Sequence, residues 1–473
     1  MDLFRWVPGK GPVQVAPKLG VASLLPSDGP LREAPCLLVL PPLWDHHGHV
    51  AWLGALLEQA DLRGCSSVDE ALNRLVREAA GPSPGAWVEG FGWDQNLWGG
   101  VYPGRASLDR LFPSRPVYLR RVDGHAAWVN SAALAAAGIG EDAPDPPGGA
   151  FLRDGGRLSG ILLDTAMERV AAHVPDPSFE DLRRRVLNAL NHLLGAGLAG
   201  VTDMGLEPAH VDVLASLDRE GALPLPVEGF AWVRPGQRDL PAPATGSRFH
   251  LRGIKLFADG ALGSRGAALR EPYSDATGTE GFLLWETEEM ARVLKEARAA
   301  GLVPAVHAIG DRAVGQVLDA AAMWGTAGVR IEHAQLVSDG DVRRMAALGL
   351  AAGIQPCHYL SDRSWAGKRL GGRMSRAYRW GSLLRAGVPL RMGTDFPIEP
   401  PDPARNFLAA AGREDPSERL SVEDVLRAYA PPHQMDPAFA CTLLGCEAPE
   451  ALGRTSESQR LVFAPPPTGD RPC

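Results

Sequence analysis

Six residues that can ligate a metal ion stand within or directly after short apolar segments of the kind that form buried strands. They are His47, His49, Lys255, His307, His333 and Asp395. Residues i and i+2 of a strand point to the same side, so His47 and His49 can bind one ion together. The other interpretation is structural, because a lone histidine near a strand end is more often a hydrogen-bonded residue and Asp395 could belong to a turn. We favour a metal site, because the structural interpretation would have to hold for all six residues independently.

Lys255 needs chemistry of its own, because an ammonium group cannot bind a metal ion. It stands in the apolar segment Gly253-Ile254-Lys255-Leu256-Phe257, where burial lowers the pKa of a lysine from its ordinary value of about 10.4. A neutral amine can add carbon dioxide to give a carbamate, an N6-carboxylated lysine whose two oxygens bridge two cations. With a single metal ion Lys255 would stay an amine, and it could also pair with Asp203 or Asp259.

The segments that carry these residues belong to a set of eight, each nearly continuously apolar and without alternation. Such segments are typical of parallel strands that are buried on both faces of a sheet. The eight predicted strands are Cys36–Trp44, Pro116–Arg121, Leu198–Thr202, His250–Phe257, Leu302–Val306, Val329–Ile331, Leu350–Ile354 and Pro389–Met392. Amphipathic helices separate several of them, such as the apolar stripe from Leu182 to Leu194, which follows Ser178 as N-cap.

Repeated alternation of strand and helix predicts an α/β fold with a parallel sheet, and eight strands predict a (β/α)8 TIM barrel. Barrel enzymes carry their active sites at the carboxyl ends of the strands. We therefore expect the six residues to converge at one mouth, where they suffice for a pair of metal ions.

Two connections are far longer than the loops of a regular βα unit, namely residues 50–115 and 123–197. Long insertions at a barrel mouth usually form lids or substrate-binding walls. The second insertion contains two short apolar runs around Asp154-Gly155-Gly156, which predicts a β-hairpin. The domain assignment is the barrel with its insertions at residues 36–431, and Pro-rich terminal segments at residues 1–35 and 432–473.

Composition and charge exclude several classes of protein. The chain has 473 residues and a formal net charge of −8, which argues against nucleic acid as the main partner. No apolar run is long enough for a transmembrane helix, and the start MDLFRWVPGKGPV is unlike a secretory signal. The six cysteines form no CxxC pair, which is typical of reduced thiols in a cytoplasmic protein. The expected partner is a small-molecule substrate rather than nucleic acid or a membrane, and a homodimer is left open.

Seven longer motifs carry a family resemblance. They are Asp45–His49, Gly92–Gln95, Arg120–Ser131, Lys255–Arg265, His307–Ala313, Arg330–Gln335 and Gly393–Pro397. Over about residues 36–430 the chain resembles the amidohydrolase superfamily, and specifically its amidohydrolase 3 branch, which includes N-substituted formamide deformylase. The resemblance implies hydrolysis of an amide-type C–N bond with one or two divalent metal ions, commonly zinc, and the same six ligands. It also implies a small β-sandwich from both chain ends, which we expect to be small, distorted or missing because the tail lacks a clear strand motif with Gly and Asp.

The chemistry expected from these residues is metal-assisted hydrolysis. A bound divalent ion lowers the pKa of its water from about 15.7 to about 7. Asp395 would take the proton of this water and pass it to the departing nitrogen, which leaves poorly unless it is protonated. The metal ion, or a donor such as His125, would stabilise the tetrahedral oxyanion.

Further side chains are expected near the mouth as substrate-binding candidates. They are Trp93, Asp94, Asp123, His125 and Arg265. The structural alternatives are that the aromatic residues pack the insertions and that Arg265 forms an ion pair. His46 points to the opposite side of its strand from His47, and we expect a supporting role for it. Two other functions stay open, which are hydrolysis of another C–N bond or an ester, and binding of metal and ligand without turnover.

Overall fold

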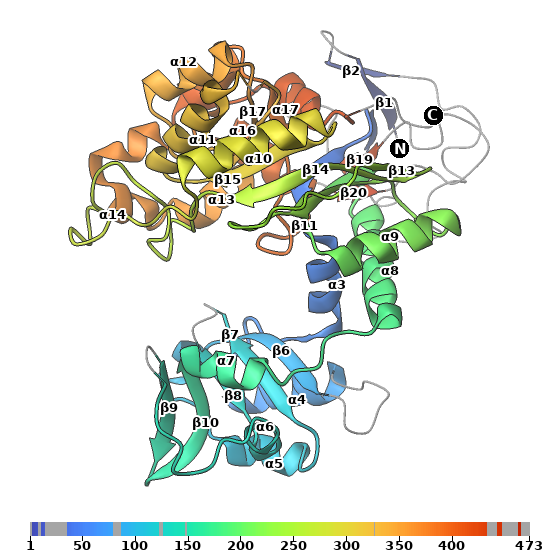
Figure 1. Ribbon diagram of the computed structural model, residues 1–473. Helices are drawn as coiled ribbons and strands as arrows, with labels where there is room; N and C mark the ends of the chain where they lie inside the picture. Colours follow the sequence, from blue (N-terminus) through green and yellow to red (C-terminus); the bar gives the residue numbers. More distant parts are fainter. Residues whose placement is uncertain are drawn as a thin grey trace. The chain divides into compact units, whose positions relative to one another are not determined.

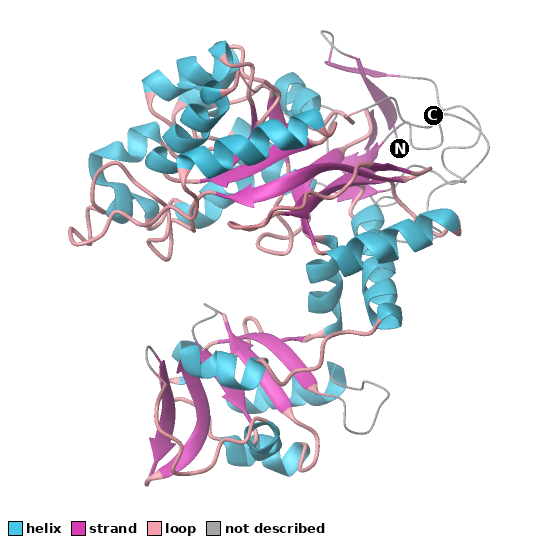
Figure 2. Ribbon diagram, in the orientation of Figure 1, coloured by secondary structure: helices cyan, strands magenta, loops and turns pink. Residues whose placement is uncertain are grey.

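The computed structural model describes most of the chain, which divides into two compact units. The described residues are 2–7, 11–14, 36–78, 87–122, 126–146, 149–325, 327–432, 442–446 and 462–464. One unit comprises Met1–Val50 and Val186–Cys473, and the other comprises Ala51–Arg185. Each unit combines strands and helices (Figure 1 and Figure 2). Within the described ranges, no helix is both long and apolar enough to cross a membrane.

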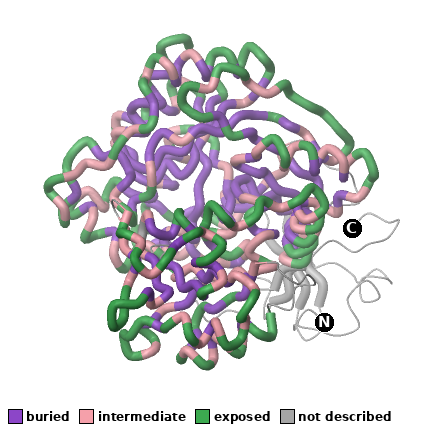
Figure 3. The backbone as a smooth tube through the Cα atoms, turned by 60° about the horizontal axis from the view of Figure 1, so that its bottom comes forward, coloured by how far each residue is buried: buried purple, intermediate pink, exposed green. Residues whose placement is uncertain are grey.

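The first unit is built on a sheet of eight parallel strands in which each strand pairs with the next along the chain. The eight strands are β4 (Trp44–Gly48), β11 (Gly200–Leu206), β12 (Val227–Trp232), β14 (Phe249–Phe257), β15 (Val303–Ala308), β16 (Arg330–His333), β17 (Ala351–Ile354) and β18 (Leu390–Met392). The short strand β13 (Ala244–Thr245) adds to β14 in the antiparallel direction. Most residues of these strands are buried (Figure 3), as their nearly unbroken apolar character requires.

The first and last strands of this sheet, β4 and β18, meet through the segment that follows β18. Gly48 forms a parallel bridge with Phe396. Asp45 on β4 is fully buried, and its carboxylate accepts hydrogen bonds from the amide of Thr394 at 3.1 Å and from its hydroxyl at 2.8 Å. These contacts bring the two edges of the sheet together, so the predicted (β/α)8 barrel is confirmed as a nearly closed barrel.

Helices connect the barrel strands and pack against them. Those of the first unit are α9 (Pro208–Arg219), α10 (Thr287–Ala299), α11 (Asp311–Met323), α12 (Asp339–Ala347), α13 (Pro356–Asp362), α14 (Ala366–Leu370), α15 (Trp380–Arg385), α16 (Pro403–Ala411) and α17 (Val422–Ala428), with 3-10 turns at Gly371–Arg376 and Pro416–Glu418. The neighbouring helices α10 and α11 both pack against β15 (Figure 1). Two further helices link the units along the chain, α3 (Val50–Glu58) and α8 (Phe179–Gly195). The helix expected after Ser178 is confirmed as α8.

The second unit has its own mixed sheet, in the order β5-β6-β7-β8-β10-β9. Its strands are β5 (Ala60–Asp61), β6 (Val88–Trp93), β7 (Val117–Arg121), β8 (Ala126–Val129), β9 (Gly149–Asp154) and β10 (Arg157–Asp164). Its helices are α4 (Val68–Glu78), α5 (Arg105–Leu111), α6 (Ser131–Ala136) and α7 (Thr165–Ala171), with a 3-10 turn at Gln95–Trp98. Strands β9 and β10 are antiparallel neighbours, which confirms the predicted hairpin.

Segments from both chain ends form a separate five-stranded sheet in the order β2-β1-β3-β19-β20. These strands are β1 (Asp2–Val7), β2 (Gly11–Gln14), β3 (Cys36–Leu40), β19 (Thr442–Cys446) and β20 (Val462–Ala464). Strand β3 pairs with β1 in parallel and with β19 in the antiparallel direction. The described part of the chain therefore shows one sheet built from both ends, and the second layer of the expected sandwich is not among the described residues.

Two predicted barrel strands are wrong. Cys36–Trp44 covers β3 of the terminal sheet, and only its last residue belongs to the barrel strand β4. Pro116–Arg121 corresponds to β7, which lies between β6 and β8 in the sheet of the second unit. The missing barrel strand is β12, whose apolar run is interrupted by Glu228 and Gly229. An apolar run reports burial and does not report in which sheet the strand is buried. No barrel strand therefore interrupts the segment between β4 and β11, and most of this segment, Ala51–Arg185, forms the second compact unit.

Candidate metal centre

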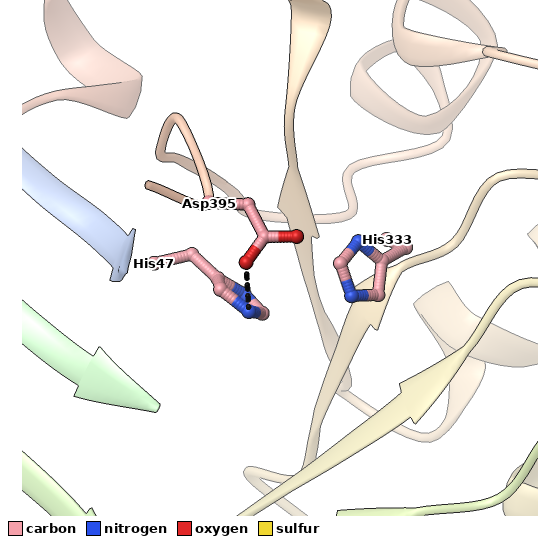
Figure 4. Close-up of side chains that lie close together, drawn as sticks. All are labelled: His47, His333 and Asp395. Atoms are coloured by element: carbon pink, nitrogen blue, oxygen red, sulfur yellow. Dashed lines mark ion pairs between the residues drawn. The ribbon is translucent and has the colours of Figure 1, made fainter. Parts of the chain in front are cut away.

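Three of the expected ligands, each from a different strand end, point to one place (Figure 4). They are His47 on β4, His333 at the end of β16 and Asp395 after β18. One ligand atom of each lies within 4.8 Å of those of the other two. Nε2 of His47 is 3.5 Å from Oδ1 of Asp395, the contact dashed in Figure 4. All three residues are buried, so a cation among them would meet two imidazoles and a carboxylate away from bulk water.

His49 and His307 adjoin this group. Nε2 of His49 lies 3.1 Å from Oδ1 of Asp395, so His47 and His49 flank the same carboxylate oxygen. The ring of His307, near the end of β15, has its centroid 4.6 Å from that of His333 on the next strand. The structure thus gathers all the histidines that the sequence nominated as ligands around Asp395 and His333.

Lys255 reaches the same place from β14. Its side chain is fully buried, and its Nζ lies 3.5 Å from Nε2 of His47 and 5.0 Å from the ring centroid of Phe257. Burial lowers the pKa of Lys255 to about 8. The two carboxylates considered as alternative partners are engaged with backbone amides: Asp203 accepts from Val50, and Asp259 accepts from three amides of the loops after β14 and β15.

A buried pair of charged residues orients His47. Oε2 of Glu332 lies 2.6 Å from Nδ1 of His47, and Oε1 of Glu332 lies 2.9 Å from Nε of Arg330. Arg330 also donates to the carbonyl oxygen of His46 at 3.0 Å. Because Glu332 occupies Nδ1, the lone pair of Nε2 is left for a ligand on the side of Asp395.

The protonation states in this cluster suit a cation. Burial lowers the pKa of His47 to about 4, and burial together with His307 and His47 holds the pKa of His333 well below its ordinary value. Burial by itself would raise the pKa of Asp395, but the surrounding imidazoles, His47 foremost, hold it well below its ordinary value. Neutral imidazoles and an ionised carboxylate are the forms that bind metal ions.

Two further observations fit a metal ion at this position. Nδ1 of His333 is buried and has no hydrogen-bond partner among the residues that the structure describes. The backbone of His333 has φ of 70° and that of Asp395 has φ of 61°, a left-handed conformation that is uncommon for residues other than glycine. Such conformations gather at functional sites, where the surrounding structure enforces them. The donor set therefore fits a divalent metal ion.

Sequence reasoning missed one histidine of this cluster. His358, on α13 after β17, has its Nε2 3.6 Å from Oδ2 of Asp395. Its position just beyond the seventh strand of the barrel could have indicated a place in the site. However, the residue stands in a helix, one turn away from the end of that strand. The role of Glu332, which lies within the motif Arg330–Gln335, was also missed. Its contact with His47 joins strands that are far apart in sequence, and the sequence does not show which strands come together.

Two residues near the predicted centre have structural partners. Arg265 pairs with Asp275, with Nη2 and Oδ2 3.1 Å apart, so the ion-pair interpretation is the one that its contacts support. His46 is buried, and its Nε2 lies 2.9 Å from the carbonyl oxygen of Ala430, which agrees with a supporting role. Substrate binding by Arg265 stays a prediction.

The remaining substrate-binding candidates belong to the second unit. Trp93 is fully buried in the core of that unit, and its Nε1 donates to the carbonyl oxygen of Leu119 at 2.8 Å. Asp94 caps the 3-10 turn at Gln95–Trp98 and pairs with Arg121 at 2.8 Å. These contacts are structural, and a role in substrate binding stays a prediction for both residues. Asp123 and His125 lie outside the described residues.

The fold is a parallel eight-stranded barrel, and imidazole and carboxylate donors gather at the carboxyl ends of its strands. Together with the similarity to a metal-dependent hydrolase of known structure, these features place the protein in the class of metal-dependent hydrolases. The chain belongs to the amidohydrolase family, whose model matches residues 37–432.

Known proteins of similar sequence and structure agree with this assignment. The chain is 32% identical over 423 residues to Protein LONG AFTER FAR-RED 3 of Arabidopsis thaliana, covering 82% of this chain and 72% of the relative. It is 27% identical over 442 residues to the N-substituted formamide deformylase of Arthrobacter pascens, covering 85% and 79%. An uncharacterized metal-dependent hydrolase of Pyrococcus horikoshii OT3 has a similar structure, with a TM-score of 0.71 and 32% identity over 83% of this chain and 80% of that one.

Proposed function

We propose that the protein hydrolyses the amide-type C–N bond of an N-formyl or N-acyl small molecule. The observation that carries the proposal is the position of Asp395, a buried carboxylate with His47 and His49 next to one of its oxygens. Such a carboxylate can move a proton between a water molecule and a leaving nitrogen. The similarity to an N-substituted formamide deformylase supports a C–N bond as the target.

The residues that would hold the metal are His47, His49, Lys255, His307, His333 and Asp395. When bound, one or two divalent ions supply Lewis-acid activation of the water and of the substrate carbonyl group. Zinc is the ion that we propose, because imidazole nitrogens and carboxylate oxygens are among its ordinary ligands. Lys255 would join the ligands as a carbamate, formed when its neutral amine adds carbon dioxide and releases one proton.

Asp395 would do the proton transfer. One carboxylate oxygen accepts a proton from the attacking water and gives it to the departing nitrogen, because an amine leaves poorly as an anion. Nε2 of His47 and Nε2 of His49 both lie next to Oδ1 of this carboxylate, and Glu332 orients His47 through Nδ1. The other oxygen, Oδ2, faces His358.

The setting of the reaction is also part of the proposal. Cys65 and Cys357 are buried free thiols, which supports a reducing compartment such as the cytoplasm. The partner that the site needs is a small-molecule substrate. A homodimer stays a prediction.

The proposal is tested by incubating purified, zinc-loaded protein with para-nitroformanilide, para-nitroacetanilide and the ester para-nitrophenyl acetate. We expect release of para-nitroaniline that a chelator abolishes and added zinc restores. Hydrolysis of the ester alone would replace the proposal by an esterase function. Tightly bound zinc without turnover of any of the three compounds would favour a binding role.

A further inference from the structure

The imidazole of His358 lies beside the candidate metal centre, outside the set of expected ligands. His358 is on the first turn of α13. Its Nε2 is 3.6 Å from Oδ2 of Asp395, whereas His47 and His49 lie next to Oδ1 of the same carboxylate. Its ring is stacked on that of His333, with the centroids 5.9 Å apart and an angle of 13° between the planes.

Nε2 of His358 is a buried polar atom with no hydrogen-bond partner among the described residues. The side chain of His358 is only 14% exposed. The distance of 3.6 Å to Asp395 is longer than the range of about 2.7–3.2 Å for an N–H···O hydrogen bond. Buried polar groups are nearly always hydrogen-bonded, so we infer that Nε2 takes a partner that is not among the described residues.

The helix that carries His358 is held firmly at both ends. The amide of Cys357 donates to Oδ1 of Asn406 at 2.8 Å. At the last residue of the helix, Asp362 accepts a hydrogen bond from the hydroxyl of Tyr378 at 2.5 Å. A side chain on such a fixed support presents its polar atom in one place, as a residue that contacts substrate must do.

We propose that His358 is a further catalytic residue, whose Nε2–H donates a hydrogen bond to the substrate carbonyl oxygen as that oxygen becomes negatively charged. This inference rests on the proposed function, because it needs an acyl group at the centre. The carboxylate of Asp395 faces Nε2, and an acceptor in that position favours the imidazole tautomer with its proton on Nε2. The carbonyl oxygen and the leaving nitrogen share one carbon atom, so a single substrate group can reach His358 and Asp395 together.

The test compares His358→Ala and His358→Gln with the wild type in the zinc-loaded, full-length protein. Loss of one oxyanion donor lowers kcat by about 10²–10³-fold, and we expect this for His358→Ala on para-nitroformanilide, with little change in KM. The side-chain amide of Gln also carries an N–H group, so His358→Gln should recover about tenfold of the loss. His192→Gln on the exposed face of α8 is the matched control and should behave as the wild type. All four proteins should bind the same amount of zinc.

A second readout needs no turnover. Methylphosphonate carries negatively charged oxygens on a tetrahedral centre, like the intermediate of amide hydrolysis. In calorimetric titrations of the zinc-loaded proteins, we expect His358→Ala to bind methylphosphonate at least about tenfold more weakly than the wild type and His192→Gln. If the wild type binds methylphosphonate in this way but cleaves no anilide, the proposed function fails while the assignment of His358 as an oxyanion donor stands.

Three results would overturn the proposal for His358. The first is that His358→Ala has the same kcat and the same affinity for methylphosphonate as the wild type. Another is loss of zinc from both His358 variants, which would make His358 a metal ligand. The third is a wild type that neither cleaves the anilides nor binds methylphosphonate, which would overturn the proposed function as well.

Discussion

Glu332 fixes the orientation of His47, with its Oε2 2.6 Å from Nδ1 of the imidazole and both side chains buried. Arg330 compensates the charge of Glu332 from the other side at 2.9 Å. Burial by itself would raise the pKa of Glu332, but Arg330 and His47 hold it below its ordinary value, so the carboxylate stays ionised. A carboxylate in this position sets the tautomer and direction of a metal-binding histidine.

Replacing this carboxylate should weaken metal binding without removing a ligand. For Glu332→Gln we expect zinc affinity to fall by about 10–100-fold, because the amide holds His47 less firmly and no longer balances Arg330. Competition with a chelator of known affinity measures the change. Glu288→Gln on the exposed side of α10 is the control, and equal affinities for the two variants would contradict the role of Glu332.

Gly353 on β17 leaves the space in which Glu332 lies. A Cβ atom at this position would stand 2.0 Å from Oε2 of Glu332. We therefore expect Gly353→Ala to displace the carboxylate, to weaken zinc binding as Glu332→Gln does, and to reduce the free energy of unfolding by about 1–3 kcal/mol. Gly367→Ala, where an added Cβ meets no atom within 4 Å, is the control. Unchanged zinc affinity in Gly353→Ala would show that Glu332 has room to move without consequence.

Asp395 should be needed for turnover more than for metal binding. Asp395→Asn keeps an oxygen that can ligate, and the histidines remain, so the variant should still bind zinc. It cannot accept and return a proton, and we expect kcat on para-nitroformanilide to fall by about 10²–10⁴-fold. Metal analysis and steady-state kinetics on the same sample test both statements. Wild-type kcat in the zinc-loaded variant would refute the role in proton transfer.

Asp45 should stabilise the barrel where its first and last strands meet. Its carboxylate accepts hydrogen bonds from the amide of His47 and from the amide and hydroxyl of Thr394. Asp45→Ala leaves these buried donors unsatisfied, at a cost of about 1–3 kcal/mol for each. Urea unfolding followed by tryptophan fluorescence should show the loss, while Asp154→Ala at the exposed tip of the hairpin should unfold as the wild type does. A wild-type unfolding midpoint for Asp45→Ala would count against this role.

The expected ligands could be found from sequence because they obey local rules. His47 and His49 follow the two-residue period of a strand, and Lys255 interrupts an apolar run. What local rules cannot supply is the contact between distant segments. The hydrogen bond between Thr394 and Asp45 joins residues 349 positions apart, and it brings Asp395 to His47.

Physical reasons explain why one strand was assigned to the wrong sheet and why other residues were missed. The run Pro116–Arg121 is buried as predicted, but in the sheet of the second unit. In β12, Glu228 pairs with Arg252 at 3.6 Å, so a charge inside the strand hid its burial. His358 lies on a helix and not at a strand end, and its contacts with Asp395 and His333 depend on the fold.

The central claim is that these side chains hold one or two divalent metal ions. Anomalous diffraction at the zinc absorption edge, from crystals of the zinc-loaded protein, measures this directly. We predict a peak about 2.0–2.2 Å from a ring nitrogen of His47, a ring nitrogen of His333 and a carboxylate oxygen of Asp395. Zinc peaks found only elsewhere in the protein would contradict the claim.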